Sequence, residues 1–234
     1  MTAARRQRYH HGDLRAALVD TAIEVIGEQG VRDFSLAEAS RRLGVAVSAP
    51  YAHFADRDEL LAAVAVHAHE LFYAALVPQM GQFEAPADRL AAMARGYVRF
   101  AAANRPLFEV LYEAGLDKAG HPEIEVAEQP RTDAVMACVR AISGDGPALP
   151  DSGDGAALSD DLASALEATA LGHVMLLLDG GPGQDGQAVE LAAERAARAT
   201  LALIDSRHLL GRPPRGPGTR LPGAPKPVVP DPEG

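Results

Sequence analysis

Side chains that donate hydrogen bonds gather near position 50 of this chain. Tyr51, His53 and Arg57 supply a phenol, an imidazole and a guanidinium within seven positions, and all three groups can donate to phosphate oxygens. Val47 and Ser48 come just before them, and a valine side chain can contact the methyl group of thymine. This combination favours contact with duplex DNA, although Tyr51 and His53 could instead pack their own domain together.

The surrounding residues predict two short helices that would position these side chains. Ser35 and Glu38 have the spacing of a capping box, in which two side chains satisfy unpaired N–H groups at a helix start. Gly44 then stands where a residue free to adopt positive φ can end a helix, and a second helix is expected over about 47–54. Two short helices joined by a glycine turn form a helix-turn-helix, whose second helix enters the major groove.

Further arginines could add contacts to the DNA backbone. Arg5, Arg6 and Arg8 form a basic arm that could enter the minor groove, or could simply be an unstructured tail. Of Arg41 and Arg42, one is expected to meet the backbone while the other is a solvated charge. The expected DNA-contacting set is Arg5, Arg6, Arg8, Ser35, Arg41, Val47, Ser48, Tyr51, His53 and Arg57.

The charge of the chain is unevenly distributed. The net charge is −10, but residues 1–57 carry eight arginines against seven acidic residues, whereas residues 58–210 carry ten basic and 23 acidic residues. The N-terminal part is therefore slightly basic, which is a small electrostatic footprint for a DNA-binding protein. An all-α ligand-binding or scaffold protein with a vestigial helix-turn-helix is the alternative that this small charge leaves open.

Composition and spacing argue against several other classes of protein. No run of 18 apolar residues and no secretory signal is visible, so neither a membrane span nor export is expected. The single cysteine, Cys138, excludes an intrachain disulfide and fits a reducing cytoplasm. His67 and His69 point to different helix faces, and the glycines of 181–186 match a dinucleotide fingerprint without following a strand. We expect no metal, no cofactor and no enzymatic activity.

The fold is expected to be all-α, because alanine and leucine dominate and no segment shows the alternation of a strand. Four parts are expected: a flexible basic arm (1–11), a helix-turn-helix head of three helices (12–57), a helical-bundle body for ligand binding and dimerisation (58–210) and a disordered tail rich in proline and glycine (211–234). Helices are expected over 12–29, 56–77, 85–103, 107–112, 121–142, 160–178 and 187–209, with a kink or break at Pro130 and loops at 143–158 and 179–186.

Apolar stripes in the body offer two sets of candidate residues. The first set could line a ligand pocket or simply form the core: Met93, Tyr97, Phe100, Phe108, Tyr112, Met136, His173 and Met175. A buried histidine needs a hydrogen-bond partner, which for His173 could be a ligand, a backbone carbonyl or another subunit. The second set is expected in a dimer interface of the last two helices: Leu162, Leu166, Leu171, Leu178, Leu191, Leu203 and Ile204.

The N-terminal third resembles the TetR family of bacterial transcriptional repressors. The resemblance rests on an ordered set of motifs over about 50 residues: Gly12–Asp13–Leu14, Gly30, Ser35–Leu36–Ala37–Glu38–Ala39, Gly44–Val45, Tyr51–x–His53–Phe54, Arg57 and Glu59–Leu60–Leu61. The C-terminal part is similar to the branch with a Trp-His-Gly signature, through Arg105–Phe108, His121–Ile124 and Gly172–His173. This chain has Thr169 near the place of the tryptophan and Val174 in place of the glycine.

The resemblance implies a DNA-binding transcriptional regulator that responds to a small-molecule effector of unknown identity. It also implies a homodimer, whose two recognition helices would bind a near-palindromic operator. The recognition helix departs from the family pattern, because Ala46 stands where a serine cap is usual and Ala52 where a basic residue is common.

Overall fold

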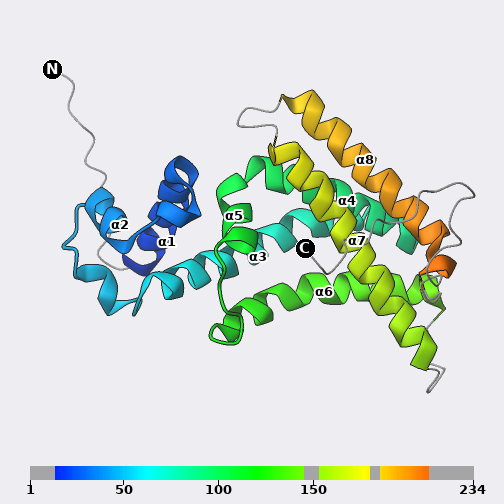
Figure 1. The fold of residues 1–234 in the computed structure, drawn as a ribbon, viewed down its shortest axis with the longest axis horizontal. Coiled ribbons are helices and arrows are strands. Elements are labelled where there is room, and N and C mark those ends of the chain that lie inside the picture. The colour runs from blue at the N-terminus through cyan, green and yellow to red at the C-terminus, as the bar shows by residue number, and fades with distance from the viewer. Residues whose placement is uncertain (1–13, 145–152, 180–184, 211–234) are drawn as a thin grey trace, which may run out of the picture.

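The computed structural model describes residues 14–144, 153–179 and 185–210, without the side chains of 153–157. Over these ranges the chain forms eight α-helices, three short 3-10 helices and no strand, which confirms the all-α prediction (Figure 1). The basic arm with Arg5, Arg6 and Arg8, the tail 211–234 and most of the two expected loops lie outside the described residues.

The head is a small cluster at one end of the molecule (Figure 1). It consists of α1 (Leu14–Gln29), η1 (Val31–Asp33), α2 (Leu36–Leu43) and η2 (Ala49–Ala52). Its core contains Leu18, Ala22 and Val25 of α1, together with Phe34 and Phe54. The guanidinium of Arg15 lies over the Phe54 ring, 5.1 Å from its centre, and so helps to keep this ring from solvent.

One long helix, α3 (Arg57–Met80), connects the head to the body (Figure 1). Its first turn is capped by Asp56, whose carboxylate accepts a hydrogen bond from the Glu59 N–H at 2.9 Å. The prediction that it ends before Pro78 is wrong. Proline lacks only one N–H, so a single bond is lost near the end of the helix. Gly81 then closes the last turn by donating to the Val77 carbonyl at 3.0 Å.

The body is a bundle of five further helices. They are α4 (Pro86–Ala103), α5 (Arg105–Glu113), α6 (Pro122–Ser143), α7 (Gly153–Asp179) and α8 (Gly186–Asp205), followed by η3 (Arg207–Leu209). Helix α4 lies in the middle and contacts α3, α6, α7 and α8. Gly96 allows a close approach there, because a Cβ at this position would come within 2.6 Å of Leu76 Cδ2 on α3.

Helices α6 and α7 differ from the sequence predictions in continuity and in length. Helix α6 is continuous through Pro130, so the expected break is absent; Val126, whose carbonyl would accept the missing bond, is exposed to water. Helix α7 begins at Gly153 rather than near Asp160. The glycines and aspartates of 151–155 suggested a longer loop, but the alanines and Leu158 that follow are strong helix formers.

By length and composition alone, two helical stretches, Arg57–Met80 and Leu158–Asp179, would be able to cross a membrane. The first contacts α1, α4, α5 and α6, so core packing explains its apolar character. The second contacts α4, α6 and α8, and 28% of its most apolar window is buried. Helix α7 therefore has an apolar face that the protomer itself does not cover.

Candidate nucleic-acid interface and internal cavity

The glycine turn of the head has the geometry that the sequence predicts. Gly44 adopts φ 68°, and its N–H donates to the Arg41 carbonyl at 3.2 Å. The Val45 N–H donates to the Ser40 carbonyl at 3.1 Å. These two bonds form a Schellman motif, which ends α2 and turns the chain toward η2. A side chain at position 44 would force a residue other than glycine into the left-handed region.

The segment after this turn presents its side chains to solvent. Val47 is 59% exposed and Tyr51 is 57% exposed, and Ser48 and His53 are also exposed. Pro50 is buried beneath them. Four of the residues expected to contact DNA are therefore accessible to a partner, and buried Pro50 anchors the segment that carries them.

The expectation of an α-helix over 47–54 is wrong, because the structure has a turn followed by the 3-10 helix η2. The N–H groups of Ala49 and His53 donate to the carbonyls three residues earlier, at 2.8 Å each. Ser48 stands at its N-cap in a helical conformation, and the Ser48 side chain makes no cap hydrogen bond. Side chains in η2 are consequently spaced more tightly than on an α-helix.

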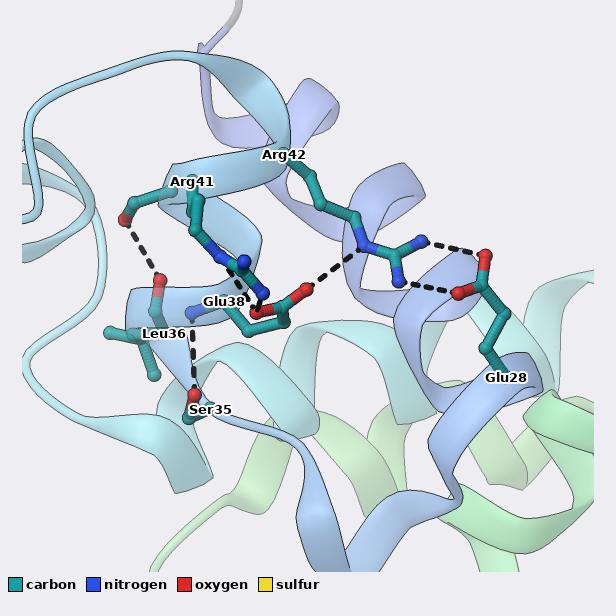
Figure 2. A network of polar contacts seen from close by, with 7 residues as sticks. Glu28, Ser35, Leu36, Glu38, Arg41 and Arg42 are labelled. Atoms are coloured by element: carbon teal, nitrogen blue, oxygen red, sulfur yellow. Dashed lines mark hydrogen bonds and ion pairs between the residues drawn. The ribbon is translucent and has the colours of Figure 1, made fainter.

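Figure 2 shows a network of charges that joins α1 to α2. Arg42 donates to both carboxylate oxygens of Glu28 and also to Glu38, which Arg41 contacts from the other side. Hydrogen bonds from these arginines lower the pKa values of Glu28 and Glu38. Ser35 accepts from the Glu38 N–H at 3.3 Å, so half of the capping box forms, while the Glu38 carboxylate is directed to the arginines instead.

The orientation of Arg57 corrects the expectation that it contacts a phosphate. Its Nε donates to the Phe34 carbonyl at 3.1 Å and its Nη2 to the Val31 carbonyl at 2.6 Å. Its Nη1 donates to Asp58 at 3.1 Å. The side chain therefore joins the first turn of α3 to the segment between α1 and α2, because unpaired carbonyls there need a donor.

A cavity of about 120 Å³ lies in the body between α4, α6, α7 and α8. Of the residues expected to line a pocket, Met93, Tyr97 and Met136 do so. Further lining residues are Leu90, Ala94, Glu128, Arg131, Thr132, Val135, Ala163, Leu166, Glu167, Ala170 and Thr200. The wall is thus mainly apolar, with one arginine and two glutamates.

The remaining aromatic candidates do not line this cavity. Phe100 packs against Phe72 with ring centres 4.8 Å apart, and Phe108 packs against Tyr112 at 4.6 Å. Tyr97 connects the two groups through a hydrogen bond between its hydroxyl and that of Tyr112. Burial raises the pKa of Tyr97 and of Tyr112, so both phenols stay neutral. These rings form the core between α3, α4 and α5.

His173 and Met175 also lie away from the cavity. The Nδ1 atom of His173 is 2.8 Å from the Thr169 carbonyl one turn earlier in α7. Its hydrogen-bond partner is therefore the backbone, which was one of the three possibilities. Met175 is exposed on the outer side of α7.

The set expected in a dimer interface divides into two groups. Leu162, Leu166 and Ile204 are buried in the hydrophobic core of the protomer, so the prediction that these three lie in a dimer interface is wrong. Leu171, Leu178 and Leu203 are half-buried and Leu191 is exposed. Leu176, which the sequence did not single out, is 79% exposed. Four of the seven expected residues therefore remain accessible, and Leu176 is the most exposed leucine of α7.

Two family models match this chain. The model described as bacterial regulatory proteins of the tetR family matches residues 18–64, and the model described as tetracyclin repressor-like, C-terminal domain, matches residues 90–201. This chain belongs to the TetR family. The family and fold are those of DNA-binding transcriptional regulators. No curated protein matches the chain.

Solved structures share the TetR fold of this chain. A protein of unknown function from Rhodococcus sp. RHA1 is 29% identical, with a TM-score of 0.63 over 84% of this chain and 97% of the other. A tetR-family regulatory protein from Rhodococcus RHA1 is 22% identical, with a TM-score of 0.59 over 81% and 96%. FadR from Bacillus halodurans, a fatty acid degradation regulator, is 15% identical, with a TM-score of 0.63 over 82% and 97%. The last two show the fold alone.

The sequence did not predict that charged residues line the cavity of this TetR-family protein. Ile124, Arg131 and Cys138 are seven positions apart on α6, so they share one helix face, and all three are buried. A single arginine on an otherwise apolar stripe was the available signal for Arg131. Glu128 and Glu167 gave no such signal, because each lies at the edge of a polar helix face.

Proposed function

We propose that this TetR-family protein is a homodimeric repressor that binds a palindromic operator and is released from it by a small molecule. The exposed set of Val47, Ser48 and Tyr51 carries the proposal. Val47 and Tyr51 are more than half exposed, so neither side chain is needed for the core of the head. Hydrogen-bonding and methyl groups of this kind match the edges of bases in the major groove.

The proposed DNA-contacting set keeps Ser35, Arg41, Val47, Ser48, Tyr51 and His53, with the arm arginines Arg5, Arg6 and Arg8 added from the sequence. Arg41 is paired with Glu38 at an exposed site. Exposed ion pairs contribute little free energy, so Arg41 can exchange Glu38 for a phosphate. The hydroxyl of Ser35 accepts the cap hydrogen bond of α2, and its own hydrogen would donate to a phosphate of DNA.

We propose that α7 and α8 pair with the same helices of a second copy. The uncovered apolar side chains there include Leu176, Met175 and Leu191, and Leu171, Leu178 and Leu203 would become covered with them. A two-fold axis through this face places two heads side by side. The operator would then be near-palindromic, with half-sites about one helical turn of DNA apart.

The cavity between α4, α6, α7 and α8 is the proposed effector site. It has polar groups at one part of a largely apolar wall, as small-molecule sites commonly do. Each of its four helices either contacts α3, as α4 and α6 do, or belongs to the proposed dimer face, as α7 and α8 do. Ligand binding would therefore change the separation of the two heads, which amounts to a coupling free energy between two sites. The protein would act in the cytoplasm without a cofactor or enzymatic activity.

Fluorescence anisotropy with the protein's own upstream intergenic DNA tests the DNA-binding part. The full chain should bind this duplex more tightly than random DNA of equal length, and affinity should fall as salt rises. Tyr51→Ala should weaken specific binding by about tenfold or more, as expected for loss of 1–3 kcal/mol of contact. Phe83→Ala removes an exposed aromatic side chain from the body and should change nothing.

A second candidate function is favoured by one observation. Arg41, Arg42 and Arg57 are all engaged in contacts within the head, which leaves few cations free for phosphate among residues 14–57. A helical ligand-binding protein with a vestigial helix-turn-helix would show this pattern. Equal affinity for upstream and random DNA, with Tyr51→Ala indistinguishable from the unmodified chain, would select this second function.

The oligomeric state is tested separately by light scattering on the purified chain. Leu176→Glu places a charge on the proposed interface and should convert a dimer to a monomer. Leu209→Glu changes another exposed leucine and should leave the dimer intact. A monomeric unmodified chain would contradict the two-fold arrangement.

A further inference from the structure

The residues of the cavity wall indicate which chemical class of effector would bind. This inference rests on the proposed function, in which the cavity is the effector site. The apolar part of the wall comes from Leu90, Met93, Val135, Met136 and Leu166, with small alanines between them. The cavity measures about 120 Å³, whereas a dry cavity of about 150 Å³ in another protein holds benzene. The space therefore fits a molecule of about the size of one aromatic ring.

Arg131 is the main hydrogen-bond donor of this wall. It is only 7% exposed, and its guanidinium lies 5.9 Å from the centre of the Phe72 ring. Within the described residues only Nη2 donates, to Glu128 at 2.7 Å and to Glu167 at 3.4 Å. The Nε atom is buried without a partner. A guanidinium has five N–H groups in a fork, so it has more donors than its two carboxylate neighbours use.

The two glutamates beside Arg131 differ in how firmly they are held. Glu128 also accepts from Lys118 at 2.6 Å. Burial opposes its ionisation, but Lys118 and Arg131 outweigh this effect and lower its pKa. The Glu167 side chain is 48% exposed and makes only the long contact to Arg131. Glu167 can therefore return to water at little cost, while Glu128 stays in place.

We propose that the cavity binds a compact apolar carboxylate whose carboxylate group pairs with Arg131 and displaces Glu167. Two carboxylate oxygens match the fork geometry of the guanidinium, and such pairs are stronger than neutral hydrogen bonds. A ligand amine would instead place a second cation beside buried Arg131, near Lys118 as well. A neutral apolar molecule would fill the space but leave the spare donors of Arg131 unused.

Isothermal titration calorimetry of the full chain with three isosteric probes tests this inference. Benzoate should bind at least about tenfold more tightly than benzamide, and benzylamine should bind most weakly, because an ionic hydrogen bond is worth more than a neutral one. Benzoate should also release the upstream DNA in the anisotropy assay, whereas benzylamine should not.

Glu167→Gln is the most informative variant, because the Glu167 side chain is exposed and the substitution should not disturb folding. Removing the competing carboxylate should tighten benzoate binding by about three- to tenfold, an increase that a purely structural role of Glu167 would not produce. Glu125→Gln removes an exposed carboxylate from α6, the helix that carries Arg131, and should leave benzoate affinity unchanged. Arg131→Met should abolish the preference for benzoate over benzamide.

Any one of four outcomes would overturn the inference. The first three are equal affinity for benzoate and benzamide, tighter binding of benzylamine, and weaker benzoate binding by Glu167→Gln. The fourth is failure of all three probes to bind at millimolar concentration. Because the titrations contain no DNA, these failures are distinct from a failure of DNA binding, which would instead contradict the proposed repressor function.

Discussion

Arginines in the head and in the body have similar partners but different surroundings. Arg42 in the head and Arg131 in the body each contact two glutamates. Arg42 lies in an exposed network between α1 and α2, whereas Arg131 lies in the core beside a cavity. Exposed pairs exchange readily with water or phosphate, while a buried charge is fixed by its neighbours. An exposed arginine of the head such as Arg42 can therefore exchange its glutamates for an external partner. A partner of Arg131 has to enter the cavity of the body.

Replacing Arg131 should have the largest effect on stability. Arg131→Ala leaves the carboxylates of Glu128 and Glu167 without their buried partner, although Glu128 keeps Lys118. Breaking a buried pair typically costs about 3–5 kcal/mol, and we expect about 3 kcal/mol here. Urea denaturation followed by circular dichroism measures it. A midpoint within error of the unmodified chain would show that the buried pair contributes nothing, and would remove the contrast with the head.

The histidine near this charge cluster should make stability depend on pH. Burial lowers the pKa of His69 to about 4 from an ordinary value near 6.5. The unfolded chain therefore binds a proton below pH 6.5 that the folded protein does not take up until about pH 4. Stability should fall as pH decreases across this window, by up to about 3 kcal/mol.

Denaturation at several pH values measures this dependence. His69→Leu should remove most of it, and because the Nδ1 atom of His69 is buried without a partner, this variant should be no less stable at pH 7. His67→Leu, on the same helix, is the matched control and should keep the dependence. An unchanged pH profile in His69→Leu would assign the effect to other groups.

The surroundings of Arg57 are intermediate between those of exposed Arg42 and those of buried Arg131. Its guanidinium serves two carbonyls of the head, those of Val31 and Phe34. Arg57→Ala should destabilise the head by about 1–2 kcal/mol, because hydrogen bonds from charged groups are lost at a partly buried site. Hydrogen exchange should show the loss in α1 and α2 but not in α4 or α8. An equal loss of protection from hydrogen exchange in the body would mean that the head and the body unfold together.

Arg42 should give the smallest effect. Arg42→Ala removes exposed contacts to Glu28 and Glu38, so the urea midpoint in 0.15 M salt should not move measurably. A shift that appears only at low salt would be consistent with screening. A loss of unfolding free energy as large as that of Arg131→Ala would contradict the distinction between exposed and buried arginines.

Sequence alone predicts local structure in this chain better than it predicts which surface a helix buries. The cap at Ser35, the positive φ of Gly44 and the cap at Asp56 follow from short-range chemistry. The breaks expected at Pro78 and Pro130 are absent, since a helix held by its neighbours tolerates one missing bond.

The site residues show why long-range arrangement was harder to predict. Val47 and Tyr51 are exposed near the turn, as their spacing suggested. Leu162 and Leu166 are apolar residues that any packed helix needs, and only the position of α4 shows that they face inward. The same holds for Arg57, whose carbonyl partners lie more than 20 positions away along the chain.

The hydrogen bonds of Arg57 make the head and the first turn of α3 one rigid piece, and this gives α3 the properties of a lever. Phe72, under the guanidinium of Arg131, lies about 22 Å along the helix from Arg57 at 1.5 Å per residue. A tilt of about 5° around Phe72 would move the head by about 2 Å. Occupation of a space no larger than one ring could therefore change the distance between two heads by several ångströms across a dimer.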